Sequence, residues 1–178
     1  MGACQGGEAS PVGCAPLGRS IPYAHHGGPE RMSLTLSQAT TIVESALKKG
    51  GELNLAPLTV AGLDAGGHLK ALSREDGSGI VRPQIAVGKA WGALGMGLGS
   101  RTLAKRVTEQ GPQQQAFFAA LNAMSEGRVV PAAGGVLIRD AGGAVIGAVG
   151  ISGDVSDKDE ACALAGIAAA RLTADPGA

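Results

Sequence analysis

The sequence predicts an α+β domain in which helices cover an antiparallel sheet. Two segments each consist of two apolar runs separated by Asp-Ala-Gly-Gly, at residues 64–67 and 140–143. Asp and Gly at a short break between such runs are typical of a tight hairpin turn, because Gly adopts positive φ without a Cβ clash. Helical patterns precede, separate and follow the two hairpins, and the βαβ alternation of a parallel sheet is missing.

The individual elements follow from periodicity and from cap residues. We expect hairpin strands at 59–63 with 69–72 and at 136–138 with 144–151. Thr35 and Gln38 form a capping-box pattern for a first helix at 37–49 that ends at a Gly pair, and Ser156 with Asp159 forms a similar pattern for the last helix. Helices are also predicted at 84–97, at 101–107 and at 113–124, the last with Phe117, Phe118, Leu121 and Met124 facing inward.

Composition sets the organisation of the chain and excludes several classes of function. Residues 1–31 are rich in Gly and Pro and have no periodicity, so we expect a disordered or loosely attached extension, a single domain at 32–174 and a frayed tail at 175–178. Fifteen acidic and fifteen basic residues balance, and aromatic residues are scarce. Neither nucleic acid nor a membrane surface is therefore an expected partner.

The cysteines and the lengths of the apolar runs indicate in which cellular compartment the protein is expected. Three cysteines without a CxxC pair predict neither a disulfide framework nor a structural zinc site, and Cys162 in the last helix is expected to be a small buried thiol. The sequence shows neither the apolar core of a signal peptide nor the ~18 apolar residues of a spanning helix. We therefore expect a cytoplasmic protein.

Few residues in the sequence are candidates for binding a ligand or a metal. Lys89 is the sole charge in a helix of small and apolar residues, and it either binds a ligand carboxylate or extends from the helix edge into solvent. Gly88 and Gly92 lie on one face of that helix, where each costs ~1 kcal/mol relative to Ala. Either another backbone, a neighbouring subunit or a flat ligand lies against them, or they serve close packing of the helix on the sheet. His68 at the first hairpin tip is either a solvated polar residue or a metal ligand.

Several linked segments resemble one known family. VAGLDAGGHLKALSREDGS, the helix around Gly88-Lys89-Ala90, the loop PAAGGVLIRDAGGAVIGAVGISG and the run from Asp159 to Cys162 together are similar to the GlcG/HbpS family, which includes the C-terminal domain of PduO-type proteins. The resemblance covers residues 34–172. It implies a central sheet of about five strands, homo-oligomers of dimer size or larger, and haem binding, without a common axial ligand.

On that resemblance we expect a non-enzymatic, oligomeric protein that binds haem or another flat tetrapyrrole. The expected binding residues are Lys89, His68, Arg74, Gly134, Gly135 and Gly153, with His68 as the metal ligand and Lys89 or a nearby Arg at the propionates. The alternative is an enzyme or auxiliary protein of a catabolic pathway that acts on a small carboxylated metabolite, held by Lys89 and backbone N–H groups of the glycine loops. A third possibility is a structural module that assembles through its Gly/Ala helix faces.

Overall fold

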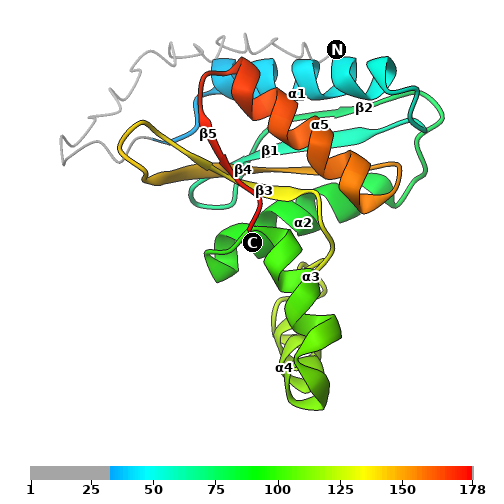
Figure 1. Ribbon diagram of the computed structural model, residues 1–178, viewed down its shortest axis with the longest axis vertical. Coiled ribbons are helices and arrows are strands. Elements are labelled where there is room, and N and C mark those ends of the chain that lie inside the picture. The colour runs from blue at the N-terminus through cyan, green and yellow to red at the C-terminus, as the bar shows by residue number, and fades with distance from the viewer. Residues whose placement is uncertain (1–32, 178) are drawn as a thin grey trace, which may run out of the picture. The chain divides into compact units, whose positions relative to one another are not determined.

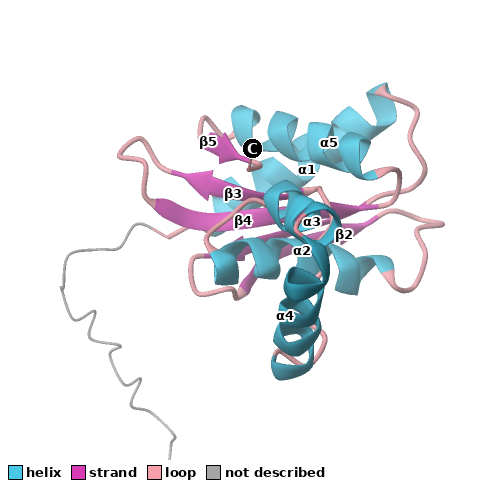
Figure 2. Ribbon diagram, turned by 60° about the horizontal axis from the view of Figure 1, so that its bottom comes forward, coloured by secondary structure: helices cyan, strands magenta, loops and turns pink. Residues whose placement is uncertain are grey.

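A five-stranded antiparallel sheet with the order β2-β1-β4-β3-β5 runs through the computed structural model, which describes residues 33–177 (Figures 1 and 2). Its strands are β1 (Thr59–Asp64), β2 (Leu69–Arg74), β3 (Gly135–Arg139), β4 (Val145–Ser152) and β5 (Thr173–Asp175). The described helices are α1 (Leu36–Glu52), α2 (Arg82–Met96), α3 (Ser100–Glu109), α4 (Gly111–Met124) and α5 (Ser156–Ala169). The predicted α+β class is confirmed.

Both predicted hairpins form, and their tips are built alike. In each turn the Asp side chain accepts two backbone N–H groups: Asp64 Oδ1 from Gly66 and His68, and Asp140 Oδ1 from Gly142 and Ala144, at 2.9–3.0 Å. The last glycine of each tetrad is left-handed, with φ of 79° at residue 67 and 84° at residue 143. The Asp-Ala-Gly-Gly sequence therefore sets the turn through both its side chain and its permitted φ.

One face of the sheet packs against α1 and α5 (Figure 1). Most of the large buried apolar side chains lie in this layer. The predicted capping box at the start of α1 is confirmed: Gln38 N donates to Thr35 Oγ1 at 3.2 Å, and Thr35 N donates to Gln38 Oε1 at 3.0 Å. Gly166 of α5 faces α1 so closely that a Cβ there would lie 2.6 Å from the Ile42 carbonyl oxygen. Cys162 is fully buried in this core, as expected, and burial raises the pKa of its thiol to about 11.

The other face packs against α2, whose backbone contacts the strands directly at two glycines. Gly135 and Gly150 are paired across β3 and β4. A Cβ on Gly150 would overlap the carbonyl oxygen of Ala86, and a Cβ on Gly135 would overlap that of Lys89. The buried alanines of α2 fill the remaining space, and a smaller apolar cluster around Leu63 and Leu137 completes this layer.

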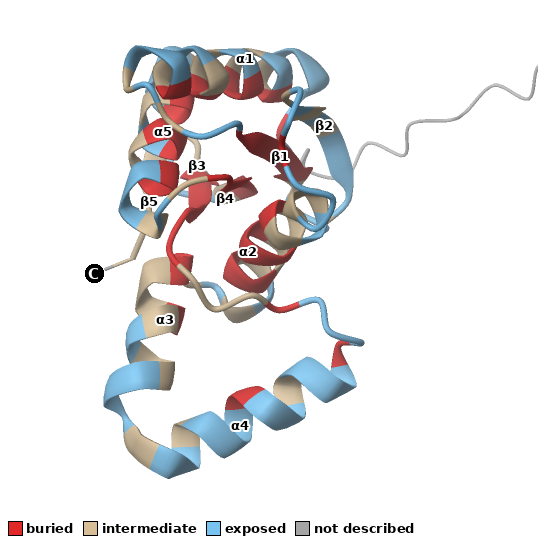
Figure 3. Ribbon diagram, turned by 90° about the vertical axis from the view of Figure 1, so that its right-hand side faces the viewer, coloured by how far each residue is buried: buried red, intermediate tan, exposed pale blue. Residues whose placement is uncertain are grey.

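Three expectations about the helices and the C-terminal end were wrong. Phe118 of α4 is buried and Leu121 is half-buried, but Phe117 and Met124 are exposed because α4 packs mainly on α3 and not on the sheet (Figure 3). Ser156 does not cap α5: the cap residue is Val155, which has no side-chain capping hydrogen bond. Asp175 does not belong to a frayed tail, because it pairs with Leu137 in β5 and Arg139 binds its carboxylate at 2.8 Å.

The predicted extension at 1–31 lies outside the described residues, as does Ala178. Among the residues that the structure describes, no helix has the combination of length and apolar character that crossing a bilayer requires.

We predict that Gly150→Ala lowers the free energy of unfolding by about 1–3 kcal/mol, because the added methyl forces α2 off the sheet. Gly51→Ala is the matched control, since no heavy atom lies within 4 Å of its added Cβ in α1. It should raise stability by up to about 1 kcal/mol. Urea unfolding followed by circular dichroism measures both, and equal stability of Gly150→Ala and the wild type would contradict the close packing.

Candidate functional site

A buried ion pair joins the helices on the two faces of the sheet. Lys89 Nζ of α2 lies 2.8 Å from Asp159 Oδ2 of α5 and donates to the Ile151 carbonyl oxygen at 2.9 Å. The side chains are 4% and 1% exposed. Lys89 therefore does not extend into solvent, and its ammonium already has a carboxylate partner.

Asp159 was assigned to a helix cap from the sequence, but its side chain lies in the interior. Besides Lys89, it accepts a hydrogen bond from Asp154 N at 3.1 Å through Oδ1. Burial raises the pKa of this carboxyl, while the Lys89 ammonium and the hydrogen bonds lower it and offset part of the rise. The structure thus places a charge pair where removal of either partner leaves the other without compensation.

A second charged cluster holds α3 against α5. Arg101 donates through Nε to Glu160 Oε1 at 2.9 Å and through a terminal nitrogen to Asp157 Oδ1 at 2.7 Å. These hydrogen bonds, that of Glu160 first, raise the pKa of the Arg101 guanidinium. Next to it, Gly135 N donates to Ser100 Oγ at 2.7 Å. Asp159 and Glu160 are neighbours that point to different cations, which makes both structural residues.

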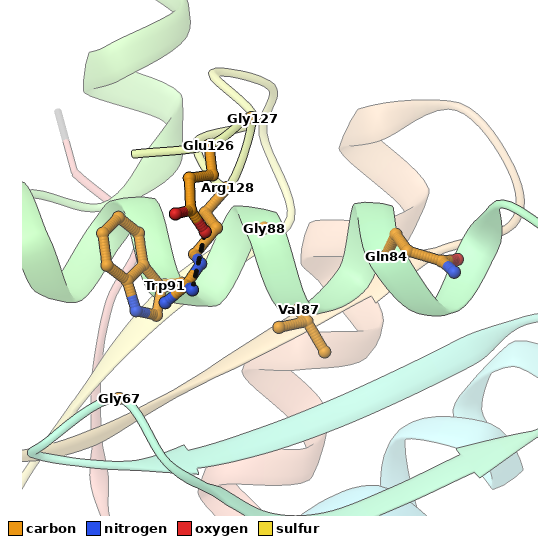
Figure 4. Close-up of a pocket in the computed structure, with 8 residues that line it drawn as sticks. All are labelled: Gly67, Gln84, Val87, Gly88, Trp91, Glu126, Gly127 and Arg128. Carbon is orange, nitrogen blue, oxygen red and sulfur yellow. Dashed lines mark hydrogen bonds and ion pairs between the residues drawn. The ribbon is translucent and has the colours of Figure 1, made fainter. Parts of the chain in front are cut away.

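The open cavity lies along one flank of α2, between the β1–β2 turn at Gly67 and the turn that follows α4. We call it the α2 cleft; its volume is about 400 Å³, within the size range of small-molecule sites. Figure 4 shows Trp91 and the pair Glu126–Arg128 together at one end, Gln84 at the other and Val87 between them. The lining residues are Gly67, Gln84, Val87, Gly88, Trp91, Glu126, Gly127 and Arg128.

Trp91 is the centre of this surface. Two smaller hollows of about 150 and 290 Å³ also have Trp91 in their walls, one toward the β1–β2 tip and one toward Met124. The guanidinium of Arg128 lies 5.9 Å from the Trp91 ring centroid, in the range of a cation–π contact. Arg128 also forms an exposed ion pair with Glu126 at 3.2 Å. The surface thus combines a flat aromatic ring with a cation.

His68 lies next to the cleft residue Gly67, and its side chain is 82% exposed. Its Nδ1 is 3.3 Å from Asp64 Oδ1. A carboxylate on one ring nitrogen is the partner that metal-binding histidines commonly have, because it leaves the lone pair on the other nitrogen. Partial burial raises the pKa of the Asp64 carboxyl, but the N–H groups of His68 and Gly66 outweigh this effect and lower it.

The other predicted site residues lie away from the cleft. Arg74 is at the end of β2, where its guanidinium bonds the Ser78 carbonyl oxygen. Gly134 and Gly135 are brought together with Lys89, but protein atoms fill the space: a Cβ on Gly134 would lie 3.1 Å from Lys89 Nζ. Gly153 packs against Leu58: a Cβ on Gly153 would lie 2.5 Å from Leu58 Cδ2. None of the six predicted residues lines the α2 cleft, although His68 and Lys89 directly follow the lining residues Gly67 and Gly88 in sequence.

Sequence reasoning missed Trp91, Glu126 and Arg128. The available signal was the spacing of Gly88 and Trp91, three residues apart in one helix and so on one face. Gly88 and Gly92 do face another backbone, as one interpretation held, and it is the chain's own: Val130 N donates to Gly88 O at 3.3 Å, and Val129 packs on Gly92. The close approach that these two glycines allow is therefore made within the chain, by residues 128–130. No cluster of three or more His, Cys, Asp or Glu suited to a metal occurs in residues 33–177.

The match to a family model and the similarity to solved structures agree with each other. Residues 34–168 match a family model described as "Haem degrading protein HbpS-like". A solved PduOC:heme complex is similar, with 26% identity, a TM-score of 0.69 and coverage of 79% of this chain and 97% of that one. A crystal structure of HbpS shares 28% identity and a TM-score of 0.63, covering 76% and 89% of the two chains. Klebsiella pneumoniae ORFY has a similar fold at 24% identity, with a TM-score of 0.67 and coverage of 77% and 90%. No curated protein matches.

We predict that Lys89→Met lowers the free energy of unfolding at pH 7 by about 3–5 kcal/mol, because it leaves the Asp159 carboxylate buried without its cation. Lys48→Met, at an exposed position of α1, is the matched control and should be neutral. Adding Asp159→Leu to Lys89→Met should recover most of the loss, as measured by urea unfolding.

The loss should also depend on pH. Lys89→Met removes the ammonium that lowers the pKa of Asp159, so the effect of burial is less offset and the pKa rises further. Above the ordinary pKa of Asp, the folded state then binds more protons than the unfolded chain. Stability then falls as the pH rises through that raised pKa, and Lys89→Met should be less destabilised at pH 5 than at pH 7. An equal loss at both pH values would argue against a buried unpaired carboxylate.

Proposed function

This chain belongs to the HbpS-like haem degrading protein family, and from that premise we propose that it binds haem or another flat carboxylated tetrapyrrole in the α2 cleft. The similarity to a PduOC:heme complex supports the ligand class. The proposed position of the ligand rests on the contact of Arg128 with the face of Trp91 in an open cavity of about 400 Å³. An aromatic plane next to a cation suits a flat molecule that carries carboxylates.

The residues at the cleft fit the chemical groups of haem. Trp91 and Val87 supply apolar surface for the ring, and Arg128 is the cation for a propionate. His68 supplies an imidazole for iron, oriented by the Asp64 carboxylate on its other nitrogen. Bound haem would supply an iron centre whose axial ligand and surrounding polarity are set by this chain.

We propose that the protein acts as a binder and does not turn its ligand over. The paired state of the interior charges supports this: Lys89 is bonded to Asp159 and Arg101 to Glu160, so none of these four faces the cleft. The alternative is action on a small carboxylated metabolite. Arg128 suits that ligand as well, but the glycine loops proposed to hold it are packed against protein atoms.

Haem titration of the full chain tests the proposal. We predict a Soret shift that saturates near one haem per chain, with quenching of Trp91, which is the sole tryptophan in the sequence. Trp91→Ala should weaken binding about three- to tenfold, since aromatic contacts contribute roughly 0.5–1.5 kcal/mol. His68→Ala should change the visible spectrum through loss of an axial ligand.

Leu36→Ala, an exposed apolar truncation in α1 on the opposite face of the sheet, is the control and should bind like the wild type. Absence of saturation, or equal binding by Trp91→Ala and the wild type, would exclude the α2 cleft as the haem site. Time-dependent loss of the Soret band in the presence of a reductant would show turnover and contradict the non-enzymatic part of the proposal.

We also propose that the chain forms homo-oligomers through α4. This helix contains no charged residue, and its Phe117 and Met124 side chains are 47% and 72% exposed. A hollow of about 250 Å³ beside it is also lined without charge, by Val107, Gln115, Phe118, Ala119, Asn122, Val129 and Pro131. A second copy docked on this surface would cover the exposed apolar side chains of α4 and bury no unpaired charge.

For this interface we predict that Phe117→Asp shifts the mass measured by light scattering toward the monomer, because it places a charge in an apolar contact. Leu36→Asp, also at an exposed apolar position, should leave the mass unchanged. A wild-type chain that is monomeric at all concentrations, or an unchanged mass for Phe117→Asp, would refute α4 as the contact.

A further inference from the structure

The turn after α4 brings two opposite charges, Glu126 and Arg128, to the lining of the α2 cleft. Glu126 and Gly127 both have left-handed backbones, with φ of 56° and 78°. Glycine adopts this conformation freely, whereas for a residue with a Cβ it costs roughly 1–2 kcal/mol. Such residues are concentrated at ligand clamps and switches. The turn ends α4 and returns the chain to α2.

Contact with α2 holds the returning chain in place. A Cβ on Gly88 would lie 3.0 Å from the Arg128 carbonyl oxygen and 2.7 Å from a Val130 methyl, so the absence of a side chain at Gly88 lets the segment approach. The hydrogen bond from Val130 N to Gly88 O fixes the register. Arg128 is thereby placed over Trp91, one helical turn beyond Gly88.

Glu126 occupies part of the hydrogen-bonding capacity of this arginine. One terminal nitrogen of Arg128 is 3.2 Å from Glu126 Oε2, and both side chains are mostly exposed, at 60% and 80%. A guanidinium has five N–H donors, so most of them stay available. An exposed ion pair is worth at most about 1 kcal/mol, which a carboxylate with better geometry can outcompete.

We propose that Glu126 is a resident counter-ion of Arg128, which a ligand carboxylate displaces on entering the α2 cleft. The inference rests on the proposed binding of a flat ligand at Trp91, and it adds which group of the ligand is recognised. Arg128 then selects planar molecules that carry a carboxylate over neutral planar molecules. Glu126 weakens the binding of every anionic ligand by competition and by repulsion, and leaves neutral ligands unaffected.

The test compares haem, which carries two propionates, with haem dimethyl ester, in which both are neutral. Quenching of Trp91 reports binding to the full chain in the same low concentration of co-solvent. Glu126→Gln should tighten haem binding about two- to fivefold and leave the ester unchanged. Arg128→Met should weaken haem binding about three- to tenfold and again leave the ester unchanged.

The matched control is Glu52→Gln. Glu52 forms an exposed ion pair with Lys49, also at 3.2 Å, in α1 on the opposite face of the sheet. It should not alter binding of either compound. Circular dichroism confirms folding, and Arg128→Lys, which keeps the charge but not the fork of donors, should retain part of the preference for haem over the ester.

The outcomes separate the two proposals. If haem and its ester both quench Trp91 with equal affinity and neither variant alters their ratio, the cleft binds tetrapyrroles but the counter-ion proposal is overturned. A parallel change for both compounds in Glu126→Gln also overturns it, because a general effect on the cleft would then be responsible. If neither compound saturates the protein, the proposed function fails and the counter-ion role fails with it.

Discussion

The direct contact between α2 and the sheet at Gly135 and Gly150 is the constraint on which the other layers depend. Because these two glycines are paired on one face, the backbone of α2 contacts the strands directly at this point. This proximity allows the Lys89 side chain to reach Asp159 on the helix that covers the other face. With α2 further from the sheet, the lysine would not span the distance and the carboxylate would be buried alone.

The ion pair contributes more to the relative placement of α2 and α5 than to net stability. Removal of two charges from water costs several kcal/mol per ion, and mutual attraction offsets this only with good geometry and additional hydrogen bonds. Those bonds are present: Lys89 also donates to the Ile151 carbonyl oxygen, and Asp159 also accepts Asp154 N. Since only one placement of the helices satisfies all of them, the pair favours a single arrangement of both layers.

Local patterns predicted most of the fold, and long-range contacts account for the errors. The Asp-Ala-Gly-Gly turns and the Thr35 capping box depend on residues within five positions, so the sequence contains all that they require. Asp159 satisfies the same local rule at the start of α5, yet its carboxylate bonds Lys89, which lies far away in the chain. The pattern within α4 gave no sign that the helix would pack mainly on α3 and not on the sheet.

The sequence did not predict the α2 cleft for the same reason, since Trp91 and Arg128 belong to segments that are far apart in the chain. The link between them is Gly88, whose missing side chain lets residues 128–130 lie against α2. A glycine at this point lowers the stability of an isolated helix by about 1 kcal/mol, and the returning segment restores part of it through the hydrogen bond to Gly88 O. The side of α2 that packs on the sheet is rich in Ala. At Gly88, the absence of a side chain lets the returning segment place Arg128 over the Trp91 ring. Because one helix serves both purposes, changes that tilt α2 on the sheet also move Trp91 relative to Arg128.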